Sequence, residues 1–425
     1  MNPTIWATPL QVLRRHQRTT FLVASGLSTA GSFAGLTAKG WILIESSNSP
    51  LLLALHFAAL ALPSLLVSGP AGVLTDRLGS EPVLIRAQWG LFGAGVLGAI
   101  AIPLSGGGIQ VGLLLLSTLL IGIASTFELT ARSKYCALLV DRPEQLAPYL
   151  ASFSVVFNVG KLVGPPLGGW LLALGGATTA LSLDAATYLL PVAAILWLLV
   201  PNRDAEQRSG RAIGQSAEPA TDTTLMSAWG DCGPVLRHVL RFTAVACLAI
   251  FFHPGLAPLM ARRVLGASPQ ALGNFTAVLA AGSICGGLVL QRYSRALANR
   301  PGWLLGFCTL VTGLAQLGLA SSNGPGLGLA MTFVIGAGTA SLLAGTNLIA
   351  QVGSPQRLRG RMAGLSQIAF LGGGGLSGLI AAGITQTWGL GPCFGLLGAV
   401  GCALGGLELV RHRRTRLEPP RLRSA

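Results

Sequence analysis

The sequence predicts an all-α membrane protein with twelve transmembrane helices, arranged as two pseudo-symmetric six-helix bundles. Three observations lead to this fold class. Only 10% of the residues are charged and the mean hydropathy is +0.64, whereas soluble proteins carry about 25% charged residues. Apolar runs near or above the ~18 residues that cross a bilayer recur along nearly the whole chain. The two halves of the chain also repeat each other's motifs.

The apolar runs divide into two groups of six. The first group lies at about 19–44, 51–74, 83–103, 109–135, 149–174 and 178–200, and the second at 238–261, 269–291, 302–320, 325–350, 362–386 and 389–410. The polar interval between the groups is expected to be a flexible cytoplasmic linker, because it is rich in acids, arginines, glycines and serines. The predicted domains are therefore a bundle over 1–200, a linker over 201–237 and a bundle over 238–425 that ends in a basic tail.

The positive charges predict the orientation in the membrane. All but four of the 29 lysines and arginines fall in the termini, the linker and the loops that would share one side of the membrane, or within a few residues of the span ends that border them. Because cytoplasmic loops carry an excess of these residues, we expect both termini in the cytoplasm and the protein in the inner (plasma) membrane. This topology accounts for the net charge of +15, so no nucleic-acid partner is expected.

Three motifs of the first half recur in the second. Gly72–Arg77 is echoed by Gly287–Arg292, Arg142–Leu146 by Ser354–Leu358, and the pair Gly164 and Gly168 by Gly374 and Gly378. The similar offsets indicate a duplicated six-helix unit. Parallel repeats with a substrate cavity at their interface are typical of alternating-access transporters.

The residues 160–169 read G-x-x-x-G-P-x-x-G-G within an apolar run. Gly160, Gly164 and Gly168 are four residues apart, so they form one stripe along a helix where a neighbouring backbone can approach closely. Pro165 removes a backbone donor and bends the helix, and Gly169 completes the motif. A bent, glycine-striped helix suits two helices that slide or rock against each other, as transport requires.

Two of these stretches resemble known signatures. Gly72, Asp76, Arg77 and Gly79 match the loop 2–3 pattern of the major facilitator superfamily, G-x-x-x-D-R-x-G, although Ser80-Glu81 stands where that pattern has a basic pair. The stretch 160–169 is similar to the antiporter signature on helix five of proton-coupled exporters in the same superfamily.

Further stretches narrow the resemblance to one branch. Asn158–Pro165, Ala131-Arg132 and Leu183–Tyr188 resemble bacterial exporters of siderophores such as enterobactin and of macrolides. The resemblance covers essentially the whole chain. It implies a monomeric exporter of a small amphipathic, drug- or siderophore-like molecule that works by proton antiport in the lipid bilayer. It also implies that Asp76 acts as a latch, which holds the cytoplasmic side shut when the cavity opens outward.

Two alternatives stay open at this stage. One is a lipid or lysophospholipid flippase of the same fold, and the other is a transport-inactive membrane receptor or scaffold. An enzyme is not expected, because the chain contains no catalytic motif of the metalloprotease, serine-hydrolase or nucleotide-binding kind. No cofactor and no metal are expected either, since the cysteines and histidines do not cluster.

Charges inside the predicted spans mark candidate functional residues, because a charge in hydrocarbon costs at least ~2.5 kcal/mol and needs a partner, water or a purpose. Lys161 and Asp184 lie at similar depth, so we expect them to pair and take part in proton coupling, with a static salt bridge as the alternative. Lys39 is a candidate for the substrate cavity, where it would suit an anionic or zwitterionic substrate. It could also snorkel to the interface or pair with Glu45.

Glu128 and Arg132 are four residues apart with the acid first, which favours an intrahelical pair. We interpret both as proton-coupling candidates, with a pair at the helix end as the alternative. His253 is the histidine deepest in a span of the second half and is a candidate cavity residue, although a lone histidine more often packs in the interior. Ionisable residues thus concentrate in the first half, which predicts that proton coupling takes place there.

Overall fold

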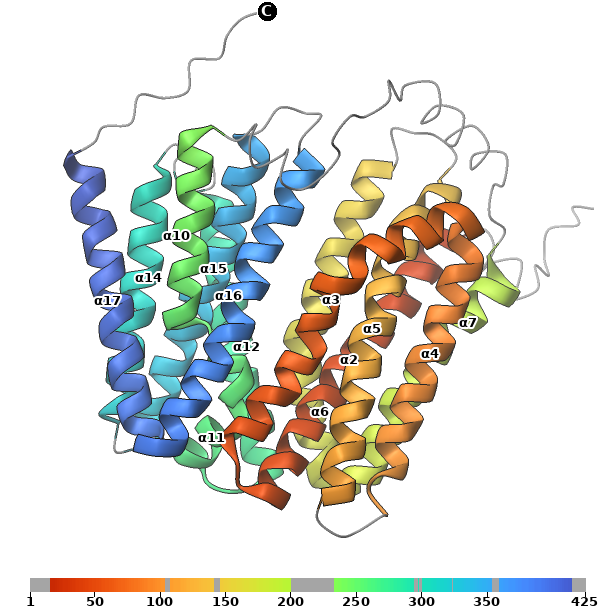
Figure 1. Ribbon diagram of the computed structural model, residues 1–425, viewed down its shortest axis with the longest axis horizontal. Coiled ribbons are helices and arrows are strands. Elements are labelled where there is room, and N and C mark those ends of the chain that lie inside the picture. Colours follow the sequence, from red (N-terminus) through yellow and green to blue (C-terminus); the bar gives the residue numbers. More distant parts are fainter. Residues whose placement is uncertain are drawn as a thin grey trace, which may run out of the picture. The chain divides into compact units, whose positions relative to one another are not determined.

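The computed structural model describes residues 16–103, 108–140, 146–199, 233–293, 297, 300–322, 324–353 and 359–414. The described residues form helices that group into two compact units (Figure 1). The first unit contains Met1–Asn48 and Ala59–Ala220, and the second contains Ser49–Ala58 and Thr221–Ala425. Most of the expected linker, up to residue 232, lies outside the described residues, so the boundaries 1–200, 201–237 and 238–425 stay predictions.

The helices follow one another in the order that the apolar runs predict. The first half contains α2 (Gln17–Ser47), α3 (Pro50–Leu78), α4 (Ser80–Ile100), α5 (Gly108–Leu138), α6 (Leu146–Thr187), α7 (Leu189–Ala193) and the π-helical turn η2 (Ala194–Leu198). The second half contains α10 (Pro234–Ile250), α11 (His253–Leu265), α12 (Pro269–Arg292), α14 (Pro301–Ala320), α15 (Pro325–Val352), α16 (Arg359–Trp388) and α17 (Leu390–Arg414).

The described helices account for twelve passes through a membrane. Ten helical stretches among the described residues are long and apolar enough to cross, by length and composition. One of them, Val155–Leu198, contains two passes because the chain reverses within α6, and α16 adds a further helix of 30 residues. The all-α fold class with twelve helices is confirmed.

The reversal within α6 occurs at Gly176. Its φ of 76° and ψ of 178° lie in a region that is essentially restricted to glycine. The arm of α6 that follows Gly176 runs antiparallel to α2, because Gly31 lies against Thr187 whereas Gly35, further along α2, lies against Asp184. The arm before Gly176 runs parallel to α2. The two passes are therefore joined by a turn at one glycine, without a separate loop.

The second unit is also held together by close backbone packing at glycines. A Cβ on Gly313 of α14 would lie 2.8 Å from the carbonyl oxygen of Gly398 on α17, and one on Gly405 of α17 would lie 2.7 Å from that of Gly306. Such contacts bring two helices to their closest approach without a side chain between them. In α12 and α15, Gly282 is packed in the same way against the backbone of Phe333.

The predicted equivalence of the two halves holds for helix pairs rather than for single positions. As α6 packs on α2, so α16 packs on α10, where a Cβ on Gly373 would lie 2.7 Å from the carbonyl oxygen of Ala244. Gly374 contacts Phe251, but a Cβ on Gly378 would meet nothing within 4 Å. The loop motifs at Arg142 and Ser354 lie outside the described residues.

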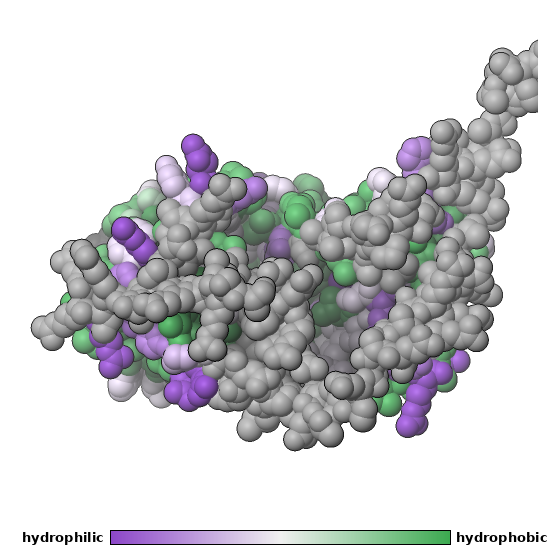
Figure 2. Space-filling view, turned by 90° about the horizontal axis from the view of Figure 1, so that it is seen from above, coloured by the Kyte–Doolittle hydropathy of each residue, from purple (hydrophilic) through white to green (hydrophobic). Residues whose placement is uncertain are grey.

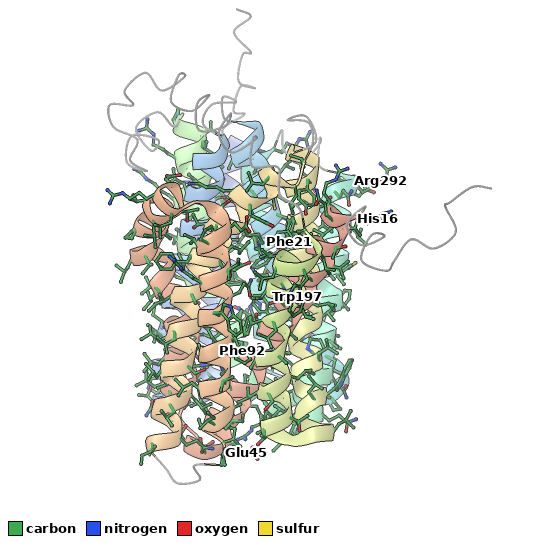
Figure 3. The ribbon with its side chains drawn as sticks, turned by 90° about the vertical axis from the view of Figure 1, so that its right-hand side faces the viewer. His16, Phe21, Glu45, Phe92, Trp197 and Arg292 are labelled. Carbon is green, nitrogen blue, oxygen red and sulfur yellow. The ribbon has the colours of Figure 1, made fainter. Side chains whose placement is uncertain are left out.

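Large apolar side chains cover the outer faces of the helices. Leu174 is 88% exposed, Leu66 is 80% exposed and Trp197 is 68% exposed, and many other large apolar residues are exposed in the same way. Figure 3 shows α2 running the length of its unit, with His16 and Glu45 at opposite ends. Seen from above, hydrophilic side chains lie beside apolar ones at the helix ends (Figure 2). Such apolar surface suits hydrocarbon, and the protein is a multi-pass membrane protein.

Candidate functional site

The glycine stripe of α6 is packed onto the backbone of α2, as the motif predicts. A Cβ on Gly160 would lie 2.8 Å from Thr29, and one on Gly164 would lie 2.6 Å from the carbonyl oxygen of Ala30. Gly168 is closer still to the carbonyl of Ala34. The contact therefore joins backbone to backbone over two helical turns.

The other members of this motif lie at the same level of the bundle. Gly169 is buried and Pro165 is half-buried beside the stripe. A glycine contact of this kind has no interlocking side chains, so the two helices can shift along each other at low cost. The movement that the motif predicts stays a prediction.

The loop between α3 and α4 explains one glycine of the second signature. Gly79 has a φ of 86° and a ψ of 157°, which only glycine adopts readily, and it sets the sharp entry into α4. Gly72 lies within α3, where a Cβ would meet nothing within 4 Å. Arg77 is exposed in the last turn of α3.

Asp76 forms a salt bridge with Lys134 on α5. Both side chains are accessible, with 70% of Asp76 and 43% of Lys134 exposed. The pair links the ends of α3 and α5 on one side of the first unit, and the latch role of Asp76 stays a prediction.

Lys39 is buried inside the first unit, so it does not follow the alternative in which it snorkels to the interface, and its role in a substrate cavity stays a prediction. It is 1% exposed, and its Nζ donates a hydrogen bond of 2.8 Å to Oγ of Ser117 on α5. Ser117 in turn donates to the carbonyl oxygen of Ala94 on α4, at 2.6 Å. Gly98 leaves the room for this contact, because a Cβ there would lie 2.9 Å from both Cε of Lys39 and Oγ of Ser117.

Asp184 is the acidic group that interacts electrostatically with Lys39. It lies on the second arm of α6, is 2% exposed, and neither of its carboxylate oxygens has a hydrogen-bond partner. The hydroxyl of Tyr188, one turn further along, is its neighbour. Gly35 on α2 provides the space, since any side chain there would overlap the carboxylate.

The predicted pair of Lys161 and Asp184 is wrong. Lys161 lies on the other arm of α6, where its Nζ is 5.0 Å from the ring centroid of Phe157 and 5.9 Å from that of Phe33. These distances are those of cation–π contacts. The two charges lie at similar depth in the membrane, but their side chains do not face each other.

The predicted pair of Glu128 and Arg132 is present. Nη1 of Arg132 lies 3.1 Å from Oε1 of Glu128, and both residues are buried. Nε2 of Gln88 on α4 lies 3.4 Å from the same carboxylate oxygen, and the guanidinium of Arg132 lies 5.5 Å from the ring of Phe153 and 5.7 Å from that of Phe157. The pair is therefore an interior one and not a solvated pair at a helix end.

His253 lies at a break in the first helix of the second half. The helix stops at Ile250 and resumes at His253, and the carbonyl oxygen of Ile250 accepts a hydrogen bond of 3.2 Å from Nε2 of Gln316. His253 is 4% exposed and packs edge-on against Phe251, with 5.0 Å between ring centroids. This burial favours the packed interpretation, and the cavity role stays a prediction.

The sequence interpretation missed a buried acid in the second half. Glu408 on α17 is 5% exposed, and its Oε1 lies 2.8 Å from Nε2 of His238 on α10. A Cβ on Gly302 of α14 would contact both Glu408 and His412. Glu408 was overlooked because it stands near the end of its span, beside a basic tail that suggests a solvated charge.

Comparison with known proteins identifies the family. A family model described as transmembrane secretion effectors, of the major facilitator type, matches residues 7–418. The chain belongs to this family. Multidrug efflux pumps named Tap are relatives: that of Mycolicibacterium fortuitum is 26% identical over 370 residues, covering 85% of this chain and 88% of the relative. That of Mycobacterium tuberculosis is 26% identical over 385 residues, covering 88% of each.

Solved transporters share the fold of this family member at low sequence identity. A mutant of the nucleoside transporter NupG superimposes with a TM-score of 0.71 at 13% identity, covering 93% of this chain and 99% of that one. A bacterial homologue of the iron transporter ferroportin, in an inward-facing state, gives 0.66 at 16% identity, covering 94% and 98%. The major facilitator fold that the resemblance implies is confirmed.

Proposed function

We propose that the protein is a secondary active transporter that exports a small amphipathic molecule from the cytoplasm in exchange for protons. The relatives named multidrug efflux pumps support export of drug-like molecules. The antiporter-like stripe of Gly160, Gly164 and Gly168, packed on α2, supports an exchange mechanism. The buried acids Glu128 and Asp184 of the first unit support protons as the exchanged ion.

One observation carries the proton-coupling part of the proposal. Asp184 is buried with neither carboxylate oxygen hydrogen-bonded, and Lys39 is its counter-charge. Protonation of Asp184 would cancel its charge and leave Lys39 with Ser117 alone. That change would alter the packing of α2 against the second arm of α6. Because the glycine stripe of the first arm contacts the same helix α2, a proton at Asp184 can bias the movement of α2.

Glu128 is the second candidate proton carrier. It is paired with Arg132 and accepts a contact from Gln88, so its protonation would release Arg132. Lys161 and Arg132 meet at the ring of Phe157, which connects this pair with the helix that carries the glycine stripe. Protonation of Asp184 would thus affect the α2–α6 contact through Lys39 on α2, and protonation of Glu128 would affect it through Arg132 and Phe157.

Reconstituted transport tests the proposal. The full-length protein in proteoliposomes is expected to move Hoechst 33342 or carboxyfluorescein when a pH gradient is imposed. Asp184→Asn is expected to abolish gradient-driven movement while leaving counterflow without a gradient. Glu45→Gln, at an exposed acid of α2, is the control and should transport as wild type. Unchanged gradient-driven transport in both Asp184→Asn and Glu128→Gln would exclude proton coupling through these residues.

The orientation and assembly belong to the same proposal. We infer that both termini face the cytoplasm of the inner membrane, that two halves rock about the glycine-packed helices, and that the monomer is the working unit. A fluorescent protein fused after Ala425 should fluoresce in intact cells, because it folds in the cytoplasm. Alkaline phosphatase at the same position should be inactive, and activity there would reverse the orientation.

A further inference from the structure

Lys161 is a cation for which the described residues offer aromatic faces but no acid. Its ammonium lies 5.0 Å from the ring centroid of Phe157, on its own helix, and 5.9 Å from that of Phe33 on α2. The two rings meet edge to face with centroids 6.1 Å apart. The three side chains form one unit, which we call the Lys161 cradle.

Two other interior cations in the described part of the first unit each have an acid. Arg132 is paired with Glu128 at 3.1 Å, and Lys39 interacts with Asp184. Arg132 also lies 5.7 Å from the ring of Phe157, so two cations share that ring while one acid stands beside them. The group of Glu128, Arg132 and Lys161 therefore carries one uncompensated positive charge among the described residues.

Aromatic faces compensate an ammonium ion only in part. A cation at the depth of a predicted span is costly unless an anion or water meets it. In the described part of the first unit, both buried acids are already engaged by other cations. The missing negative charge is therefore one that a ligand can supply.

The Lys161 cradle is accessible, whereas Lys39 is not. Lys161, Phe33 and Phe157 are all half-buried, while Lys39 is 1% exposed and held by Ser117. The cradle also borders the glycine stripe, because a Cβ on Gly164 would lie 2.6 Å from Cβ of Phe33. A ligand held there would contact both helices that the stripe brings together.

We propose that the Lys161 cradle is a binding subsite for the anionic group of an amphipathic ligand, such as an aromatic carboxylate or a phosphate. The ammonium of Lys161 pairs with the anion, and the rings of Phe33 and Phe157 contact the apolar part next to it. As a substrate site this inference rests on the proposed export function. Binding itself requires no proton gradient, so the two can fail separately.

A binding experiment with matched probes tests the subsite. The full-length protein, in nanodiscs of phosphatidylcholine, is titrated with 1-naphthylacetate and with the uncharged 1-naphthylacetamide by equilibrium dialysis. Wild type should bind the anion about tenfold more tightly than the amide, as expected for one charge-assisted contact. Lys161→Gln should lose this preference, and Lys161→Arg should keep it.

A control variant separates the subsite from general electrostatics. Arg86→Gln removes one positive charge at an exposed position of α4 and should retain the anion preference. All variants are compared by gel filtration and melting temperature, so that a misfolded protein is recognised. The inference is overturned if wild type shows no preference for the anion, or if folded Lys161→Gln keeps it.

A third arm distinguishes a soluble anion from a lipid headgroup. Adding phosphatidylglycerol to the nanodiscs should weaken naphthylacetate binding to wild type, but not residual binding to Lys161→Gln, if the subsite takes anionic headgroups. No effect of phosphatidylglycerol would assign it to soluble anions. If anion preference is present while gradient-driven transport is absent, the subsite stands and the proposed proton antiport fails.

Discussion

Lys39 on α2 and Asp184 on the second arm of α6 are buried neighbours of opposite charge. Gly35 leaves the space that the carboxylate of Asp184 occupies. Ser117 fixes the ammonium from the other side at 2.8 Å. The arrangement places one acid and one base at the contact between two helices that also form the glycine-packed interface. It therefore yields predictions for both stability and transport.

Removal of one member of this pair should destabilise the protein more than removal of both. Lys39→Met or Asp184→Asn leaves the other charge buried and uncompensated, which typically costs about 3–5 kcal/mol. The double variant should cost less than either single one. Unfolding of the purified protein in detergent measures all three free energies. Additive costs would show that the two charges do not interact.

Filling the glycine stripe should block transport. In Gly168→Ala the new methyl group overlaps the backbone of Ala34, which cannot turn aside as a side chain can. We expect a destabilisation of about 1–3 kcal/mol from overpacking and loss of transport in proteoliposomes. The matched control is Gly93→Ala on α4, where a Cβ meets nothing within 4 Å and transport should persist. Wild-type transport by Gly168→Ala would contradict a close sliding contact.

The pair of Asp76 and Lys134 should matter for transport more than for stability. Both side chains are largely accessible, and exposed ion pairs contribute only about 0–1 kcal/mol. Asp76→Asn should therefore unfold nearly as wild type but transport slowly if the pair is a latch. The exchange variant D76K/K134D restores the attraction and should recover part of the rate. Full activity of Asp76→Asn would remove the latch from the mechanism.

Gly79→Ala should strain the entry into α4. With φ at 86° and ψ at 157°, a residue with a Cβ costs roughly 1–3 kcal/mol. Gly72→Ala, in the same signature but within helix α3 and with open space around it, should be neutral or slightly stabilising. Thermal unfolding of both variants in detergent provides the comparison. Equal stabilities would contradict a backbone role for Gly79.

The spacing of residues along one helix was sufficient to predict the features that depend on a single helix. The four-residue spacing of Gly160, Gly164 and Gly168 predicts a close helix contact because its cause lies within one helix, and the contact is found. The pairing of Glu128 with Arg132 is predicted for the same reason. The number of helices follows from hydropathy alone.

The partners of Lys39 and Lys161 could not be predicted from depth in the membrane. Depth places a residue along a helix but does not say which neighbour it faces, and Asp184 faces α2 rather than Lys161. One signal was present in the sequence. Gly31, Gly35 and Lys39 are four residues apart, so Lys39 continues the small-residue face that packs against the second arm of α6.

The burial of Lys39 also bears on how the chain is made. When α2 leaves the ribosome and enters the bilayer, the lysine has no counter-charge, because Asp184 is synthesised five membrane passes later. A lone lysine at the centre of an inserting segment costs ~2.5–3.5 kcal/mol on the translocon scale, and Lys39, which lies in the last third of α2, costs less than that. The counter-charge of Lys39 is therefore present only once the second arm of α6 has been made.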